Sequence, residues 1–324
     1  MKRNLKQVFE PVGVIGLGLM GRGIAASLAA NGICVLAYDR AASQARKCIP
    51  HIQHAIDELV ERRIVRPAAV RDWKNRFAIA SSMKSLADCR FVIESVNEDL
   101  KLKRKVYDQL EAAVPESAVI GSNTSSLPIT VLQTGRKHPS RFIGMHWGEP
   151  AHVMRYLEII PGDRTSAETV KLTRSVAERC GKEPTVLRKD IQGFLSNRMM
   201  YAMLREAFYL VESGVADIET VDRSFRNDIG WWATIAGPFR WMDLTGIPAY
   251  AAVMEGLLPK LSNSRRVPAL MRKMVKDGAL GISNRKGFYA YDRASAKQWE
   301  QAWVNFTFDI RRLIETYEQK GLRF

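Results

Sequence analysis

The sequence predicts an α/β protein in which a doubly wound sheet is followed by an all-helical C-terminal domain. Three observations lead to this prediction. Continuous apolar runs, which are typical of strands buried on both faces, alternate with helical segments over residues 1–189. Helical periodicity then dominates residues 190–324. The length of 324 residues suits two domains of ordinary size, so we place the domain boundary near residue 189.

A βαβ unit comes first. Residues 11–16 form a short apolar run, a helical segment covers 23–30, and a second apolar run covers 33–38. Asn31 and Gly32 are residue types that commonly end helices, and they separate this helix from the second strand. The pattern therefore predicts two strands joined by a helix.

The alternation continues along the chain. A helical hairpin is expected near residues 43–77, where apolar residues recur at helical spacing and Pro67 marks a bend or a fresh start. Further strands are predicted at residues 91–93, 118–120, 142–145 and 184–186. Helices are predicted at residues 99–114 and 194–211, and an additional amphipathic helix at 294–319.

The composition is that of a globular protein with a surplus of positive charge. Lys and Arg number 49 against 34 Asp and Glu, giving a net charge of +15 that favours anions such as nucleic acid, acidic lipid or phosphorylated metabolites. No apolar run reaches the roughly 18 residues of a membrane span, and the N-terminal residues lack the apolar stretch of a secretory signal. The four scattered cysteines are interpreted as thiols, so we expect a cytoplasmic protein without a metal site.

Gly16, Gly18 and Gly21 match the G-x-G-x-x-G pattern between the first strand and the first helix. Here Gly16 permits a tight turn, Gly18 lets the backbone approach a pyrophosphate, and Gly21 lets helix and strand pack closely. Asp39 ends the next strand, where it can accept hydrogen bonds from the adenosine ribose and would repel a 2′-phosphate. We therefore predict a Rossmann-type domain that binds NAD rather than NADP. The predicted cofactor site comprises Gly16, Gly18, Leu19, Met20, Gly21, Asp39 and Arg40.

His146 is the strongest candidate for a proton-transferring residue. It follows the apolar run 142–145 at a predicted strand end, and ligands bind at the carboxyl ends of strands in open α/β sheets. Glu158 lies among apolar neighbours twelve residues later, where a carboxylate is costly unless it is paired. An imidazole that gains a proton during turnover is a suitable partner. A structural His at a strand end and a Glu that caps a local group are the alternatives.

The sequence resembles the 3-hydroxyacyl-CoA dehydrogenase family over about residues 10–291. The resemblance is carried, in order and at similar spacing, by the segments 16–25 (GLGLMGRGIA), 94–103 (ESVNEDLKLK), 122–127 (SNTSSL), 141–146 (RFIGMH), 153–160 (VMRYLEII), 193–198 (GFLSNR), 237–239 (GPF) and 287–289 (GFY). It implies NAD-dependent oxidation of a 3-hydroxyacyl-CoA to the 3-oxoacyl-CoA, and the reverse reaction, as in fatty acid metabolism.

The resemblance also implies roles for individual residues, carried over by position. His146 would be the base, and Glu158 the carboxylate that orients it. Ser125 and Asn197 would hold the reacting oxygen and the substrate carbonyl. The helical domain of the family forms a dimer, so we expect a homodimer. Two further residues implied in cofactor binding are Glu98 and Lys103.

The sequence departs from the family pattern near the substrate. Glu149 replaces an Asn on the nicotinamide side of the family's site. On the hairpin, Ala55 stands where the family has a Ser that touches CoA, whereas Arg62 keeps the charge of the matching Lys. Residues 62–76 carry a net charge of +5, which suits the phosphates of CoA but is equally expected of a solvated basic face. The predicted substrate contacts are Ser125, Asn197, Arg62 and Glu149.

Relatives of the family that act without CoA give the main alternative, a dehydrogenase of a free 3-hydroxy acid such as carnitine or a sugar acid. Trp147, Trp231 and Trp232 would suit a cationic substrate through cation–π contacts, although tryptophans also pack at domain interfaces. A 6-phosphogluconate-type dehydrogenase would need a Lys where this chain has Asn197. A nucleic-acid binder would need a recognition motif that the sequence lacks. An inactive NAD-binding structural protein would have no need of a His–Glu pair.

Overall fold

The computed structural model describes residues 11–323. The chain forms two compact units, of which the first ends at Asn197 and the second starts at Arg198. Residues 190–197, which the sequence analysis placed in the second domain, therefore belong to the first unit. They are held there in part by Leu195 and Ser196, whose backbone amides donate to Glu158.

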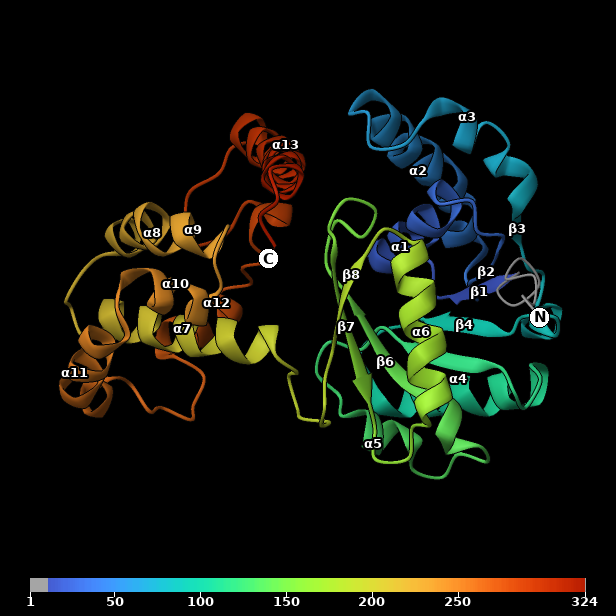
Figure 1. The fold of residues 1–324 in the computed structure, drawn as a ribbon, viewed down its shortest axis with the longest axis horizontal. Helices are drawn as coiled ribbons and strands as arrows, with labels where there is room; N and C mark the ends of the chain where they lie inside the picture. The colour runs from blue at the N-terminus through green and yellow to red at the C-terminus, as the bar shows by residue number, and fades with distance from the viewer. Residues whose placement is uncertain (1–10, 324) are drawn as a thin grey trace. The chain divides into compact units, whose positions relative to one another are not determined.

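An eight-stranded sheet organises the first unit (Figure 1). Its strands are β1 (Val12–Ile15), β2 (Val35–Tyr38), β3 (Phe77–Ile79), β4 (Phe91–Glu94), β5 (Val119–Ser122), β6 (Phe142–Trp147), β7 (Tyr156–Pro161) and β8 (Glu183–Val186). They lie in the order β3-β2-β1-β4-β5-β6-β7-β8. The first six run parallel, whereas β7 pairs antiparallel with β6 and β8 pairs parallel with β7. This is the strand order of a Rossmann-type domain with two added strands, which confirms the predicted fold class.

The central strands are buried on both faces, as their continuous apolar runs predicted. Every residue of β1, β4 and β5 is buried. The sequence analysis missed two strands. It assigned β3 to the end of the hairpin, because this edge strand has three residues and is mostly exposed. It noted the apolar frame of β7 without assigning a strand, because the polar Glu158 stands in its middle.

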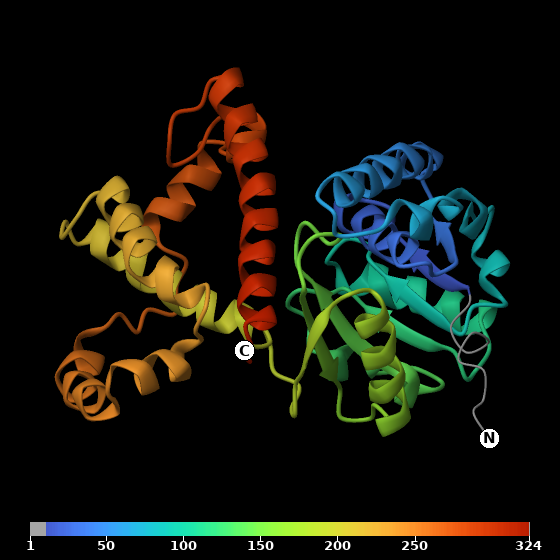
Figure 2. The same cartoon turned by 45° about the horizontal axis from the view of Figure 1, so that its top comes forward.

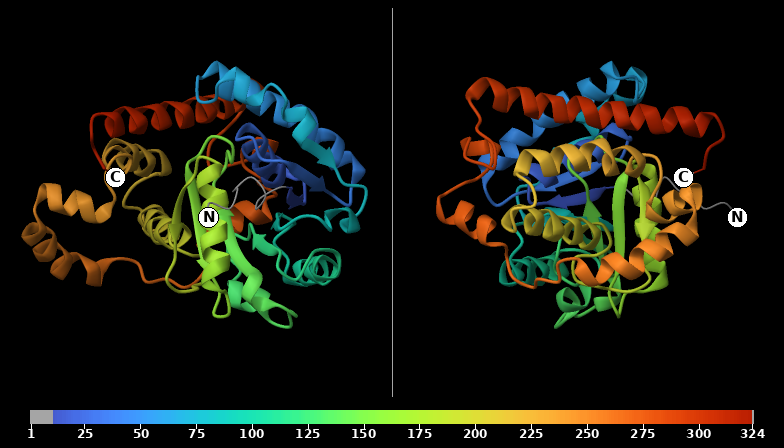
Figure 3. Two further views of the ribbon diagram at one scale, coloured as in Figure 1. Left: turned by 45° about the vertical axis from the view of Figure 1, so that its right-hand side comes forward. Right: turned by 90° about the vertical axis from the view of Figure 1, so that its left-hand side faces the viewer.

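Helices flank the sheet (Figure 3). Those of the first unit are α1 (Leu19–Ala30), α2 (Ala42–Glu61), α3 (Pro67–Val70), α4 (Leu100–Ala113), α5 (Ile129–Gln133) and α6 (Ala167–Arg179). The predicted hairpin consists of α2, which packs on α1, and the shorter α3 (Figure 2). Pro67 occupies the first turn of α3, where its missing N–H is not needed for helical hydrogen bonds.

The second unit is entirely helical apart from isolated bridges. Its helices are α7 (Ser196–Glu212, which starts in the first unit), α8 (Ile218–Asn227), α9 (Ile229–Ala233), α10 (Pro238–Thr245), α11 (Ile247–Leu257), α12 (Ala269–Lys276) and α13 (Arg293–Gln319). The predicted C-terminal helix is thus one continuous helix, α13 (red in Figure 3). Asp292 caps it by accepting from the Ser295 amide at 2.7 Å.

The second unit buries few of its side chains. Among residues 198–323, Ala236, Ala296 and Phe308 are buried. Large apolar residues are instead exposed, and Phe239 and Trp231 show 78% and 77% of their surface. A helical unit with so little buried apolar surface gains little stability from its own core.

Two further findings bear on the sequence predictions. The cysteines at positions 34, 48, 89 and 180 are thiols rather than disulfides. Within residues 11–323, every helix is too short or too polar to cross a membrane.

Candidate active site

The glycine-rich loop joins β1 to α1 and leaves a space bounded by backbone. Gly16 has φ of +83°, and a Cβ there would lie 2.6 Å from the carbonyl oxygen of Ser95. A Cβ at Gly21 would lie 1.7 Å from the carbonyl oxygen of Gly16, so this position also requires glycine. A Cβ at Gly18 would meet nothing within 4 Å. Gly16 and Gly21 thus shape the loop, while Gly18 leaves open space on its outer side.

This open space lies at the N-terminus of α1. Gly18 is the N-cap residue, and no side chain caps the helix. Gly18 and Leu19 are exposed, and Met20 is partly exposed. Uncapped amides at a helix N-terminus favour a phosphate. The loop therefore fits the pyrophosphate of the predicted dinucleotide.

Asp39 follows β2 and is tied to the same loop. Its Oδ2 accepts from the Leu17 amide at 2.7 Å, and its Oδ1 accepts from the Ala41 amide at 2.7 Å. Each carboxylate oxygen retains a second acceptor site, which can receive a ribose hydroxyl. Arg40 lies exposed beside it. Asp39 is thus held at the position that the dinucleotide pattern requires.

His146 and Glu158 face each other across the β6–β7 ladder. They are register partners in this antiparallel pair, and His146 Nδ1 lies 3.0 Å from Glu158 Oε2. Both residues are buried, with 8% and 1% of their surface exposed. The sequence-predicted pair therefore exists, and it lies at the carboxyl end of β6. Because Nδ1 is engaged, Nε2 is the ring nitrogen that can act on a substrate.

Four donors lie within 3.0 Å of the Glu158 carboxylate, and a fifth, the Ser196 hydroxyl, lies 3.4 Å from Oε2. Oε1 accepts from the amides of Leu195 and Ser196, each at 3.0 Å, while Oε2 accepts from His146 and from the Tyr156 hydroxyl at 2.6 Å. Burial by itself would raise the pKa of Glu158, but the hydrogen bonds from His146, Tyr156 and the two amides outweigh it and lower this pKa to about 2. Glu158 is therefore ionised at neutral pH and can stabilise an imidazolium.

Tyr156 is a member of this cluster that the sequence analysis missed. Its hydroxyl also lies 3.0 Å from His146 Nδ1 and 2.5 Å from Ser196 Oγ. The residue had been counted only among the apolar neighbours of Glu158. The available signal was the spacing, because residues two apart on a strand point to the same face of the sheet.

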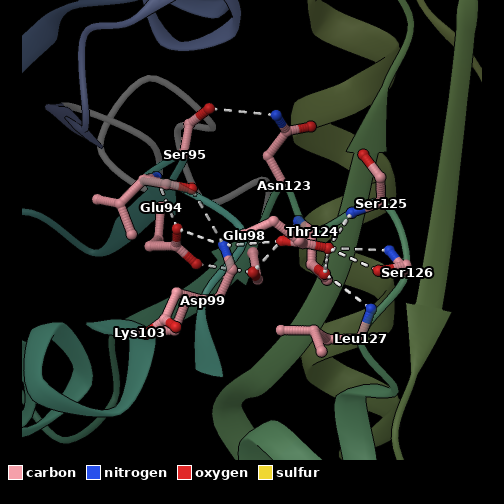
Figure 4. A network of polar contacts seen from close by, with 12 residues as sticks. Glu94, Ser95, Glu98, Asp99, Lys103, Asn123, Thr124, Ser125, Ser126 and Leu127 are labelled. Carbon is pink, nitrogen blue, oxygen red and sulfur yellow. Dashed lines mark hydrogen bonds and ion pairs between the residues drawn. The ribbon is translucent and has the colours of Figure 1, made fainter. Parts of the chain in front are cut away.

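Ser125 lies in the loop after β5, and Glu98 organises that loop (Figure 4). Glu98 Oε1 accepts from the Thr124 hydroxyl at 2.5 Å and from the amides of Ser125 and Ser126 at 2.9 and 3.0 Å. Asn197 Nδ2 donates to the carbonyl oxygen of Ser125 at 2.7 Å. The structure thus brings Ser125, Asn197 and Glu98 together, and it leaves the Ser125 side chain exposed.

Lys103 lies deeper than a cofactor contact would suggest. Its side chain is 1% exposed, and Nζ lies 2.8 Å from Glu94 Oε1 and 3.4 Å from Glu98 Oε2 (Figure 4). Glu94, at the end of β4, also accepts from the Tyr107 hydroxyl and the Ser122 hydroxyl, each at 2.7 Å. Lys103 therefore reaches the predicted cofactor site through Glu98. The sequence analysis gave Glu94 no role.

The loop between β6 and β7, residues 148–155, carries Glu149. Lys182 holds this loop, since its buried Nζ donates to the carbonyl oxygens of Ala151 and Met154 at 2.5 and 2.6 Å. The same Nζ lies 5.2 Å from the Trp147 ring, which is 2% exposed. Trp147 is thus unavailable to a cationic substrate, which corrects that part of the carnitine alternative. Glu149 itself is exposed.

The hairpin residues predicted to meet CoA differ in their exposure. Ala55 is 1% exposed, whereas Arg62 is exposed at the C-terminal end of α2. His152, from the loop 148–155, lies against α2 with Nε2 at 3.4 Å from Glu58 Oε2. This contact joins the loop to the same helix that carries Ala55.

Two family models cover most of the chain. Residues 11–191 match the model described as the NAD binding domain of 3-hydroxyacyl-CoA dehydrogenase, and residues 193–291 match its C-terminal domain. The two matches follow one another along the chain, as the two predicted domains do.

Individual relatives agree with these matches. A 5-formyl-3-hydroxy-2-methylpyridine 4-carboxylate 5-dehydrogenase of Mesorhizobium japonicum is 33% identical over 310 residues, covering 95% of this chain and 99% of the relative. A probable 3-hydroxybutyryl-CoA dehydrogenase of Deinococcus radiodurans is 35% identical over 280 residues, covering 86% and 99%.

Solved structures give the same result. A crystal structure of a 5-formyl-3-hydroxy-2-methylpyridine 4-carboxylic acid 5-dehydrogenase, described as NAD⁺-dependent, has a TM-score of 0.89 at 31% identity and covers 95% of this chain and 99% of its own. An (S)-3-hydroxybutyryl-CoA dehydrogenase from Ralstonia eutropha has a TM-score of 0.74 at 32% identity and covers 88% and 100%. The chain therefore belongs to the 3-hydroxyacyl-CoA dehydrogenase family and is an NAD-dependent oxidoreductase.

Proposed function

We propose that this enzyme oxidises the hydroxyl group of a free hydroxy acid, and reduces the corresponding oxo acid, with His146 as the proton-transferring residue. The observation that carries the proposal is the His146–Glu158 pair at the carboxyl end of β6, in the same unit as the dinucleotide-binding loop. Ligands of doubly wound sheets bind at that edge.

In the oxidation, His146 Nε2 removes the hydroxyl proton while Glu158 stabilises the imidazolium that forms. Bound NAD would accept the hydride, a hydrogen with its electron pair, that leaves the substrate carbon as the carbonyl forms. Gly18, Leu19 and Met20 would hold its pyrophosphate, and Asp39 its ribose. In the reduction, the protonated His146 returns its proton to the substrate oxygen.

Ser125 and Asn197 are proposed to position the substrate oxygens. Their link, from Asn197 Nδ2 to the Ser125 carbonyl, supports a joint role. Glu98 fixes the Ser125 loop by accepting from the amides of Ser125 and Ser126 and from the hydroxyls of Thr124 and Ser126. This arrangement leaves the Ser125 hydroxyl available to a ligand.

The burial of Ala55 favours a free acid over a CoA thioester. The family's CoA-contacting hydroxyl is replaced here by a methyl group that is 1% exposed, so this position offers a ligand neither a polar group nor surface. The Mesorhizobium japonicum relative is named for a carboxylate substrate without CoA. Both observations support the alternative that the sequence analysis ranked second.

A CoA thioester is the second candidate, and the hairpin charges favour it. Arg62, Arg63, Arg66, Arg71 and Lys74 are all exposed. Such a basic surface suits the phosphates of CoA. Relatives named as 3-hydroxybutyryl-CoA dehydrogenases support the same candidate.

A substrate panel separates the two candidates. NADH formation is measured with free hydroxy acids, including hydroxymethyl pyridine carboxylates, and with (S)-3-hydroxybutyryl-CoA. We expect turnover of a free acid and none of the thioester. The variant R62A/R66A provides a check, because it should leave KM for a free acid unchanged. Turnover of the thioester with a KM that rises several-fold in R62A/R66A would overturn the free-acid proposal.

We further propose that the enzyme is a homodimer formed through the second unit. The support is the shortage of buried side chains among residues 198–323 and the exposure of apolar residues such as Phe239 and Trp231. Sedimentation equilibrium should give twice the chain mass of 36.6 kDa, and a mass equal to one chain would contradict the proposal. The cytoplasmic location stays a prediction from the sequence.

A further inference from the structure

Tyr156 lies within the His146–Glu158 pair. Its hydroxyl oxygen is 2.6 Å from Glu158 Oε2, 3.0 Å from His146 Nδ1 and 2.5 Å from Ser196 Oγ. A tyrosine hydroxyl has one proton to donate, and an ionised carboxylate can only accept. The Tyr156 proton therefore goes to Glu158, and its oxygen can accept from Ser196.

This arrangement fills the acceptor capacity of Glu158. A carboxylate has about four lone-pair sites, and here two backbone amides occupy Oε1 while His146 and Tyr156 occupy Oε2, with the Ser196 hydroxyl farther from Oε2 at 3.4 Å. His146 and Tyr156 thus draw on the same oxygen. Each hydrogen bond to Oε2 reduces the negative charge that is available to the other donor.

We propose that Tyr156 is a positioning residue that shares Glu158 Oε2 with His146 and thereby limits how strongly the carboxylate holds the imidazole proton. The catalytic consequence rests on the proposed function, whereas the geometry does not. A group that takes and returns a proton in each cycle works best when its proton affinity matches the operating pH. Without Tyr156, Glu158 would hold the proton of His146 more firmly than it does now.

The surroundings of the imidazole support this role. In the part of the chain that the structure describes, the titratable groups hydrogen-bonded to His146 are Glu158 and Tyr156, both on β7. Phe194, which precedes α7, packs on the ring with 5.5 Å between centroids. Burial and the bond to Glu158 raise the pKa of Tyr156 above its usual value, so its hydroxyl keeps the proton it donates.

The direct test is a titration of His146 by NMR in the intact protein labelled with [¹⁵N]histidine. The spectrum of H146Q assigns the His146 signals among the five histidines. In Y156F the ring packing is kept and the competing donor is lost, so the pKa of His146 should rise. An unchanged or lowered pKa of His146 in folded Y156F would overturn the proposal.

A matched control comes from the same unit. Tyr107 also donates from its hydroxyl to a buried carboxylate, Glu94, at 2.7 Å. Y107F therefore removes the same kind of bond from a pair without histidine, and the His146 titration should not move. An equal shift of the pKa of His146 in Y107F would show a general effect of destabilisation and would contradict the proposal.

A second replacement strengthens the hydroxyl donor at position 156 instead of removing it. Site-specific incorporation of 3-fluorotyrosine at position 156 makes the hydroxyl more acidic and hence a stronger donor to Glu158. The pKa of His146 should then fall. Loss of packing cannot produce shifts of opposite sign in the two replacements, so a rise in both would count against the shared-oxygen role.

Kinetics with whichever compound of the substrate panel is turned over connects this role to catalysis. In Y156F the low-pH limb of kcat/KM for oxidation should move upward with the NMR titration, while KM for NAD stays constant. If the NMR shift occurs and no hydroxy acid or thioester is oxidised, the proposed function fails and the role of Tyr156 stands. If turnover is found and the limb does not move, the role of Tyr156 fails.

Discussion

Two buried carboxylates of the first unit, Glu94 at the end of β4 and Glu158 on β7, are both surrounded by donors but have different partners. Glu94 accepts from Lys103, a backbone amide and two hydroxyls, and Glu158 accepts from His146, Tyr156, two amides and, at 3.4 Å, the Ser196 hydroxyl. Each cluster includes a tyrosine hydroxyl. The main difference is the basic partner, which is Lys103 for Glu94 and His146 for Glu158.

Because of that difference, Lys103–Glu94 is suited to be a permanent ion pair, whereas His146–Glu158 is suited to proton transfer. Lys103 is 1% exposed, so its charge is neutralised inside the protein and has no route to a substrate. His146 is 8% exposed and keeps Nε2 for a ligand. From this comparison we propose that Glu94 orders the loops at the predicted cofactor site, through Lys103 and Glu98, whereas Glu158 supports the proposed proton transfer by His146.

The largest effect should follow from removing the titratable partner of Glu158. His146→Gln retains a side chain that can donate to Oε2 but removes the base, so kcat should fall about 10²- to 10⁴-fold. NAD binding, measured by calorimetry, should be unchanged. His138→Gln is the control, because this partly exposed histidine pairs with Glu116 on the surface. Near wild-type turnover in His146→Gln would show that His146 is not the base, and Glu158 would then have no catalytic role that Glu94 lacks.

The next effect should appear at the Glu94 cluster, in stability. Lys103→Met leaves a buried carboxylate without its cation, so the free energy of unfolding should drop by about 3–5 kcal/mol. Lys101→Met, on the exposed side of the same helix, should change it little. The double variant E94Q/K103M should recover part of the loss. If Lys103→Met and Lys101→Met unfold in urea with the same free energy, the buried Lys103–Glu94 pair contributes nothing to stability.

Much of the fold followed from the sequence because its signals are local. The buried runs of β1, β4 and β5 and the glycine spacing after β1 need no knowledge of distant residues. The antiparallel direction of β7, in contrast, cannot be predicted without knowing which strand it pairs with. The antiparallel register sets His146 opposite Glu158, and it thereby brings His146 close to Tyr156, which shares a face of β7 with Glu158. The pair was predicted from two residue types, but its third member was not.

Lys103 and residues 190–197 also depend on contacts between residues that are distant in sequence, so local patterns could not predict their placement. A lysine in a run of basic residues at a helix start is usually exposed, so its burial on Glu94 could not be predicted from residues 101–105. The texture of the chain changes near residue 190, yet residues 190–197 stay with the first unit. The reason is that Glu158 binds the amides of Leu195 and Ser196, a contact about forty residues apart in sequence.

The smallest effect tests the charge of Glu158 through the pH dependence of stability. Its pKa is lowered from 4.5 to about 2 in the folded protein, so the ionised form stabilises the fold at any pH above the unfolded value. This stabilisation, about 3 kcal/mol at neutral pH, should be lost as the pH falls from about 4.5 towards 2. The measurement is the difference in unfolding free energy between the wild type and Glu158→Gln at several pH values. A difference that stays constant between pH 7 and pH 3 would mean that the four donors do not favour the ionised carboxylate, and Glu158 could not then stabilise an imidazolium.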